Sequence, residues 1–384
     1  MICINSSSAL IGSFAYLRKR SLIGDAVAHS LLPGICLGFI MAGEKNMIYL
    51  FFGAFFTGWL STYLVDYIVN RSKIKQDAAI GIVLSSFFAL GIVLLTFIQN
   101  GVYTDQGGLN HFLFGQVAAI NKDELLLFAV VLAVIVLSII VFYRSFIIVS
   151  FNSDYAKSIG LPVRSIEFLM TSLTVLAIAA GIQALGVVLI SALIVTPAAA
   201  ARFWTHSLGR MLVIAVVFSV FSGLVGAYIS YANSQTPTGP WVVMILSTIT
   251  LISFIGSTKR GILARYLKAR NNKSKILLEN ILKAIYHYHE RQDRQKELNL
   301  SLAPAEILKV RRFDTADLRH GLNQLIRRGF IGYRGNNYYL TEEGMTESKR
   351  IVRLHRLWEQ YLLKRTSIDA FHVHSGAEAI EHIL

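Results

Sequence analysis

The chain has 384 residues, of which 54% are hydrophobic and 16% are charged, whereas soluble domains carry about 25% charged residues. A single soluble core cannot bury that much apolar surface, so we expect a lipid bilayer to be the solvent for much of the chain. Two cysteines exclude a disulfide scaffold and a cysteine-based zinc module, and the net charge of +14, concentrated after Ser257, indicates a second part that lies in water.

Nine apolar segments follow one another, and most are near the roughly 20 residues that a helix needs to cross a bilayer. They lie at residues 3–17 (which is short), 26–43, 47–70, 78–99, 123–143, 165–184, 186–203, 209–231 and 240–257. So many uncharged runs disfavour the alternative, a large soluble protein with buried helices. We therefore predict an all-α polytopic membrane protein with about eight or nine transmembrane helices within residues 1–257.

Basic residues are distributed between the loops as the positive-inside rule requires. With the C-terminal region placed in the cytoplasm, the outer loops hold only Lys45 and Lys122. The inner loops hold Arg18, Lys19, Arg20, Arg71, Lys73, Lys75, Arg144, Lys157, Arg164, Arg202 and Arg210. This alternation predicts an odd number of spans and an outside N-terminus. The segment 101–121 is too short to span, and we expect it to lie on the outer surface or to re-enter the protein.

Asp25 and His29 stand four residues apart near the start of the second apolar segment, so on a helix they share one face. An ionisable group within a span costs about 2.5–3.5 kcal/mol on insertion scales and usually faces a pathway. A carboxylate oxygen and an imidazole nitrogen suit manganese, zinc or ferrous iron. The residues alone leave two other interpretations open, an Asp–His hydrogen bond and an interfacial anchor.

Six ordered motifs carry a resemblance to a known family. They are LRKRSLIGDAVAHSLLPG from Leu17, DAAIGIVLSSFFALGIVL from Asp77, LNHFLFGQVAAI from Leu109, SFNSDYAKSIGLPV from Ser150, LGVVLISALIVTPAAAARFW from Leu185 and TPTGPWVVMI from Thr236. Over residues 9–257 the chain resembles the membrane subunits of the zinc, manganese and iron ABC importers. The resemblance implies the membrane channel subunit of an ATP-driven importer of divalent transition-metal ions, in which Asp25 and His29 coordinate metal on the translocation path.

The resemblance also implies partners and a location. It predicts a second permease copy or a sister permease, a cytoplasmic ABC ATPase subunit and an extracytoplasmic metal-binding protein, in the bacterial cytoplasmic (inner) membrane. The helix that docks the ATPase corresponds to Ser153, Asp154, Tyr155, Ala156 and Gly160. The sequence contains no Gly-x-x-x-x-Gly-Lys-Ser/Thr phosphate loop, so we expect a separate subunit to hydrolyse ATP and this chain to be no enzyme.

The chain changes character after the last apolar segment. Residues 258–274 are rich in Lys, Arg and Asn and predict a basic, solvated cytoplasmic linker next to anionic membrane lipid. Residues 275–345 then show three helical patterns, Ile276–Glu290, Ala303–Val310 and Thr315–Arg328, followed by strand, turn and strand. We predict a small winged helix-turn-helix domain, with a further helix over Glu343–Lys364.

The third helix of this module has a polar side that suits the major groove of promoter DNA. It carries Arg319, His320, Asn323 and Gln324, with Arg334 at the wing tip near phosphate. A winged helix used only for contact with protein is the alternative.

The end of the chain predicts a second, tentative metal site, a sensor. Glu378, Glu381 and His382 share one helix face, with His374 one turn earlier and His355 on the preceding helix. A solvated acidic face is the alternative. Residues 276–384 resemble the iron- and manganese-dependent regulators of the diphtheria toxin repressor type.

That resemblance implies manganese or iron as a ligand of the module, held by His355, Glu378, Glu381 and His382, with His374 ancillary; transport itself needs no cofactor. It also assigns residues 346–384 to an incomplete metal-binding and dimerisation region. Asn280 and Lys283 stand where the family's first helix supplies ligands, and a charged lysine cannot ligate. The alternative function is a membrane-tethered or proteolytically released, metal-dependent DNA-binding regulator.

Overall fold

The computed structural model describes residues 1–20, 22–44, 46–100, 122–232, 236, 238–291 and 301–365. The chain divides into two compact units, Met1–Ala264 and Arg265–Leu384, which are described separately. The predicted surface segment at 101–121 and the predicted ligands His374, Glu378, Glu381 and His382 lie outside the described residues.

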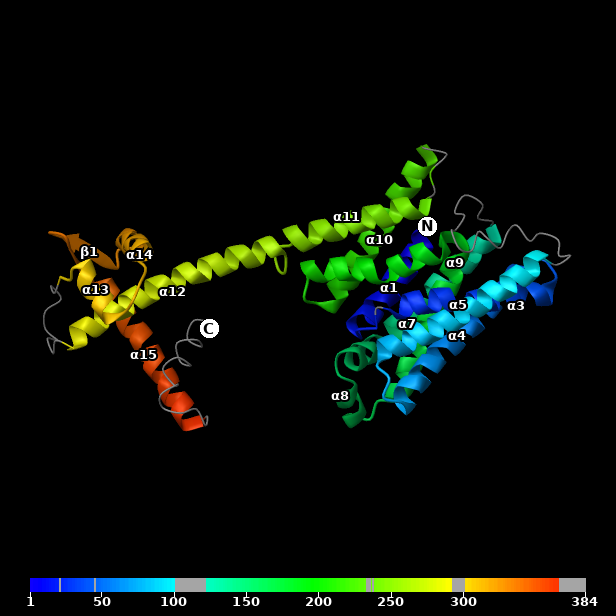
Figure 1. Ribbon diagram of the computed structural model, residues 1–384, viewed down its shortest axis with the longest axis horizontal. Coiled ribbons are helices and arrows are strands. Elements are labelled where there is room, and N and C mark those ends of the chain that lie inside the picture. Colours follow the sequence, from blue (N-terminus) through cyan, green and yellow to red (C-terminus); the bar gives the residue numbers. More distant parts are fainter. Residues whose placement is uncertain are drawn as a thin grey trace. The chain divides into compact units, whose positions relative to one another are not determined.

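The first unit is helical throughout its described part (Figure 1). Its helices are α1 (Ile2–Leu17), α2 (Ile23–Ser30), α3 (Leu32–Ala42), α4 (Met47–Arg71), α5 (Gln76–Asn100), α7 (Lys122–Phe151), α8 (Ser153–Ser158), α9 (Val163–Trp204), α10 (Leu208–Ala232) and α11 (Thr238–Gly256). Among the described residues, eight helical segments are long and apolar enough to cross a membrane, and α1 is a shorter apolar helix. The predicted polytopic all-α architecture is confirmed.

Helix α9 supplies two of these segments, Val163–Ile182 and Ala184–Trp204. The backbone leaves helical geometry at Gly186, where φ is 76° and ψ is 167°. A Cβ on Gly181 would overlap the side chain of Ile190. In a straight helix, nine residues span about 13.5 Å. The chain therefore folds back at this point, as the two predicted spans require.

Helix α1 lies inside the first unit, packed against α7, α9 and α10. Asn5 of α1 bonds to α10: its side-chain amide donates to the Ser219 carbonyl oxygen at 2.7 Å, and the Ser219 hydroxyl donates to the Asn5 carbonyl oxygen at 3.1 Å. Small and polar residues of this kind join helices that have no hydrophobic driving force between them in lipid. Protein neighbours therefore replace lipid around this short helix.

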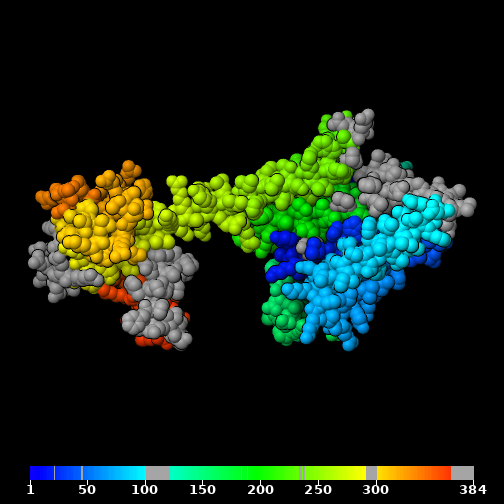
Figure 2. Space-filling view, viewed as in Figure 1, coloured from blue at the N-terminus to red at the C-terminus, as the bar shows by residue number. Residues whose placement is uncertain are grey.

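The outer surface of the first unit is apolar. Figure 2 shows α4 and α5, coloured light blue to cyan, covering one face. Large side chains such as Phe52, Phe56, Val93 and Phe97 are exposed there. An apolar surface of this extent is stable next to hydrocarbon and would aggregate in water.

The second unit contains the predicted winged helix. Its elements are α12 (Ile262–Arg291, which begins just before the unit boundary), α13 (Pro304–Val310), α14 (Thr315–Arg327), β1 (Ile331–Arg334), β2 (Asn337–Leu340) and α15 (Glu342–Arg365). The strands pair antiparallel with Arg334 opposite Asn337. Gly335 and Asn336 between them have φ of 55° and 72°, as a type I′ turn requires. Apolar residues of α12 and α14, including Ile281, Leu318 and Leu322, form the core beneath.

Residues 262–274, predicted as part of a solvated linker, are the first turns of α12. The stretch from Ile262 to Arg291 contains neither glycine nor proline and is rich in Leu, Ala, Lys and Arg, which favour a helix. The linker is therefore basic, as predicted, but largely helical.

Helices α3 and α4 approach each other closely at Gly34 and Gly53, and an alanine substitution tests how close this contact is. A Cβ on Gly34 would overlap the Gly53 carbonyl oxygen, and a Cβ on Gly53 would overlap that of Gly34. We expect Gly34→Ala to force the helices apart and lower the free energy of unfolding by about 1–3 kcal/mol. Thermal unfolding of the purified chain in detergent measures this.

The matched control is Gly81→Ala on α5, where an added Cβ meets nothing within 4 Å. Alanine there should stabilise the helix by up to about 1 kcal/mol. Equal effects of the two substitutions would contradict the close α3–α4 contact.

Candidate functional site

Asp25 and His29 both lie on α2, in its first and last turn. The His29 Nε2 is 3.6 Å from the Asp25 Oδ1. The Asp25 side chain is 51% exposed and that of His29 is 28% exposed, so neither is sealed within the bundle. The separation exceeds that of a good hydrogen bond, and it leaves both atoms able to face a common ligand.

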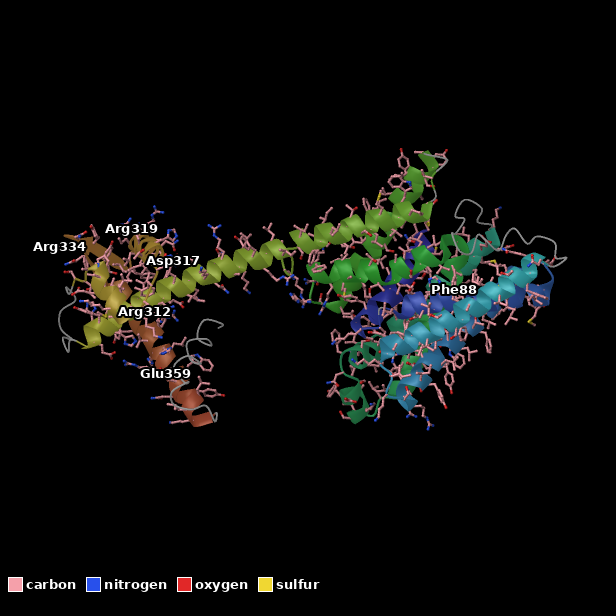
Figure 3. The ribbon with its side chains drawn as sticks, in the orientation of Figure 1. Phe88, Arg312, Asp317, Arg319, Arg334 and Glu359 are labelled. Atoms are coloured by element: carbon pink, nitrogen blue, oxygen red, sulfur yellow. The ribbon has the colours of Figure 1, made fainter. Side chains whose placement is uncertain are left out.

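The ring of His29 meets Phe88 of α5 edge-on, with the centroids 5.2 Å apart. Its Nδ1 is buried without a hydrogen-bond partner among the described residues, whereas Nε2 faces Asp25. Phe88, labelled in Figure 3, is thus the aromatic neighbour of His29 on α5. Sequence reasoning missed this residue because it lies within an apolar run, where nothing distinguishes it from its neighbours.

Two ligands do not complete a coordination shell, because zinc prefers four and other divalent metals often take more. Within the part of the chain that the structure describes, no three His, Cys, Asp or Glu side chains come together. Asp25 and His29 thus leave room for water or for groups from another chain.

Two ion pairs hold the turn that leads into α2. The Arg18 Nη2 lies 2.8 Å from the Glu167 Oε1 of α9, and the Arg20 Nη1 lies 3.2 Å from the Asp66 Oδ1 of α4. The Arg18 side chain is only 8% exposed. Burial, and then the charge of Arg20, lower the pKa of Arg18, while Glu167 opposes this effect. The sequence predicted these arginines only as loop charges; the structure shows that they anchor the turn on which Asp25 depends.

The predicted docking segment forms α8, a single short helix. The Asn152 side chain caps it by accepting from the Tyr155 amide at 2.9 Å, and Gly160 ends it with a φ of 80°. Tyr155 projects outward while Ala156 is buried. Tyr155 is therefore available for contact with another protein, while Ala156 packs α8 against the first unit.

The predicted DNA-binding residues differ in their surroundings. Arg319, His320 and Asn323 are exposed on α14, and Arg334 is exposed at the β-hairpin. Figure 3 shows Arg319 and Arg334 projecting from these two elements. Gln324 is half-buried, because it contacts His320 at 2.9 Å and accepts from Ser274 at 3.2 Å. The exposed side chains of Arg319 and Arg334 are therefore accessible to phosphate groups.

The described part of the module does not complete a metal site. His355 is buried on α15, with its Nε2 3.1 Å from the Glu359 Oε1. Lys283 of α12 is 4% exposed. A buried ammonium near the α12–α15 contact opposes a divalent cation, and the Asn280 Oδ1 is a neutral donor. Of the predicted sensor ligands only His355 lies among the described residues, so manganese or iron in this module stays a prediction.

The comparison with protein families decides the family of the first unit. Residues 1–257 match the model of the ABC 3 transport family, which covers more than half of the chain. The chain belongs to the ABC 3 transport family. Residues 341–384 match the iron dependent repressor, metal binding and dimerisation domain. Both predicted resemblances, a permease and a repressor-type module, are confirmed.

Individual relatives of this family member agree. It is 36% identical over 363 residues to the manganese transport system membrane protein MntC of Bacillus subtilis, covering 94% of this chain and 82% of the relative. It is 38% identical over 263 residues to the zinc transport system membrane protein TroC of Treponema pallidum, and the match covers 68% of this chain and 88% of TroC.

A solved structure, PsaBC from Streptococcus pneumoniae in complex with Fab, matches with a TM-score of 0.62 and 35% identity, over 70% of this chain and 92% of that one. Because the match to MntC spans 94% of this ABC 3 chain, it runs through the C-terminal unit as well.

The ion pair between the buried Arg18 and the partly exposed Glu167 can be tested by substitution. In Arg18→Gln the Glu167 carboxylate loses its partner, and we expect the free energy of unfolding to fall by about 1–3 kcal/mol. Thermal unfolding in detergent measures this. Adding Glu167→Gln should restore part of the loss, because no unpaired charge then remains.

Lys19→Gln is the control, because it removes one exposed positive charge from the same turn and should change stability by less than about 0.5 kcal/mol. A loss as large in Lys19→Gln as in Arg18→Gln would show that net charge, and not this pair, is responsible.

Proposed function

We propose that this chain is the membrane channel subunit of an ATP-driven importer of divalent transition-metal ions: manganese, zinc or iron. The observation that carries the proposal is the Asp25–His29 pair, an accessible carboxylate and imidazole 3.6 Å apart in an otherwise apolar membrane helix of an ABC 3 permease. The names of MntC and TroC, which transport manganese and zinc, support the substrate class.

The exposed position of the pair supports a pore formed by two permeases. A second copy or a sister permease that brings the same pair to the same surface would raise the ligands from two to four. Oxygen and nitrogen ligands hold such ions moderately, which suits a substrate that has to be released again.

Energy and delivery come from other subunits in this proposal. A separate ABC ATPase docks on α8 through Tyr155 and its neighbours, and an extracytoplasmic metal-binding protein delivers the ion at the opposite side. The basic loops and the C-terminal unit then lie in the cytoplasm, and the chain itself is no enzyme.

Asp25→Asn and His29→Gln test the transport function. Each keeps the side-chain volume but removes a metal ligand or weakens it, so we expect uptake of radioactive manganese to fall at least about tenfold in cells that depend on this permease. Asp123→Asn, which neutralises an exposed carboxylate at the start of α7, should leave uptake unchanged. Normal uptake by both variants, at equal amounts in the membrane, would refute the assignment.

A second function, gene regulation, rests on the exposed Arg319 and Arg334 of the winged helix. In this proposal the module binds promoter DNA while tethered to the membrane or after proteolytic release.

Binding of the purified full-length chain to duplex DNA from its own promoter tests this function. Arg334→Ala should weaken binding and reduce the slope of log K against log salt by about one, because one phosphate contact is lost. Arg353→Ala, an equal loss of charge on α15, is the control. Identical slopes for the two variants would indicate diffuse attraction without a recognition surface.

A further inference from the structure

Two connections in the first unit bring basic side chains together. Arg202 lies in the last turn of α9 and His206 in the α9–α10 connection, while the connection after α11 holds Lys259 and Arg260. The Arg260 Nη2 lies 3.0 Å from the His206 Nδ1, and the Arg202 Nη1 donates to the His206 carbonyl oxygen at 3.3 Å. Residues 54 positions apart in the chain thus form one cluster, which we call the basic corner: Arg202, His206, Lys259 and Arg260.

The platform beneath the basic corner is well held. The Trp204 indole donates to the Ser253 hydroxyl at 2.9 Å, and the Ser257 hydroxyl donates to the Phe203 carbonyl oxygen. These bonds tie the end of α9 to the end of α11. The backbone segments that carry the cations are therefore joined to each other.

The charge of the basic corner has no acidic counterpart nearby in the sequence. From Phe168 to Leu278 the chain contains neither Asp nor Glu. Because arginine only donates hydrogen bonds, the His206 Nδ1 accepts from Arg260 and the imidazole is neutral. Arg260 is also the main cause that lowers the pKa of His206, followed by slight burial and then by Lys259 and Arg202. The three cations of the basic corner make a positive site that favours an anion.

An apolar surface adjoins the basic corner. The last turns of α11 expose Leu251, Ile252 and Ile255, by 61%, 60% and 55%. The acyl chains of a lipid can pack against these apolar side chains, whereas a free anion or a nucleic acid would leave them exposed to water. Basic pockets between transmembrane helices bind anionic headgroups in this way, with a tryptophan at the interface.

We propose that Arg202, Lys259 and Arg260 bind the headgroup phosphate of an anionic phospholipid, whose acyl chains lie along the exposed side chains at the end of α11. The bound lipid joins the ends of α9 and α11 by bridging cations that otherwise repel each other. This site is separate from Asp25 and His29 and does not depend on the identity of the transported metal.

Native mass spectrometry of the full-length chain in detergent, with phosphatidylglycerol or phosphatidylcholine added, tests the proposal. The wild type should retain phosphatidylglycerol in preference to phosphatidylcholine. Arg202→Gln with Arg260→Gln should lower that retention about tenfold. The control, Arg71→Gln with Lys73→Gln, removes the same charge from another loop and should stay within about twofold of the wild type.

A second variant separates lipid binding from misfolding. Arg202→Lys with Arg260→Lys keeps the charge and should keep the lipid, while all variants should elute as the wild type does in size exclusion. Equal retention by the two glutamine variants, no preference between the two lipids, or complete displacement of the lipid by inorganic phosphate at about 10 mM would each overturn the proposal.

Discussion

The charged turn between α1 and α2 is the constraint on which the first unit depends. It brings Arg18 and Arg20 into a bundle that otherwise excludes charge, and each arginine is compensated by a carboxylate from a different helix, Glu167 or Asp66. A buried arginine without a carboxylate partner would lower the stability of the fold. The two ion pairs therefore fix the turn from which α2 starts. The position of Asp25, five residues after Arg20, follows from that anchoring.

The packing of α1 explains why this turn lies where it does. A 16-residue helix with Asn5 and several serines is too short and too polar to be stable against lipid alone. Its polar groups bond to Ser219 and to its own backbone, and α7, α9 and α10 surround it. The short helix α1 therefore lies inside the unit, and the strongly apolar α7 and α10 supply much of the lipid-facing surface.

The C-terminal unit has a small apolar core of its own, which includes Ile281, Leu318 and Leu322. Residues 341–384 match a metal-binding and dimerisation domain, and its described part is α15 with the residue before it. On α15 the buried His355 lies 3.1 Å from Glu359, and on α12 Lys283 is buried.

The sequence by itself determined the class of the protein, the order of its spans and the winged helix, because hydrophobic runs, helical periodicity and turn residues are local properties. It also singled out Asp25 and His29, since their spacing places them on one helix face. Only the tertiary structure decided that the chain reverses at Gly186, that Phe88 meets the ring of His29 and that Arg202 and Arg260 join in one basic corner. These relations link residues whose positions relative to one another depend on how separate helices pack, and no local pattern specifies that packing.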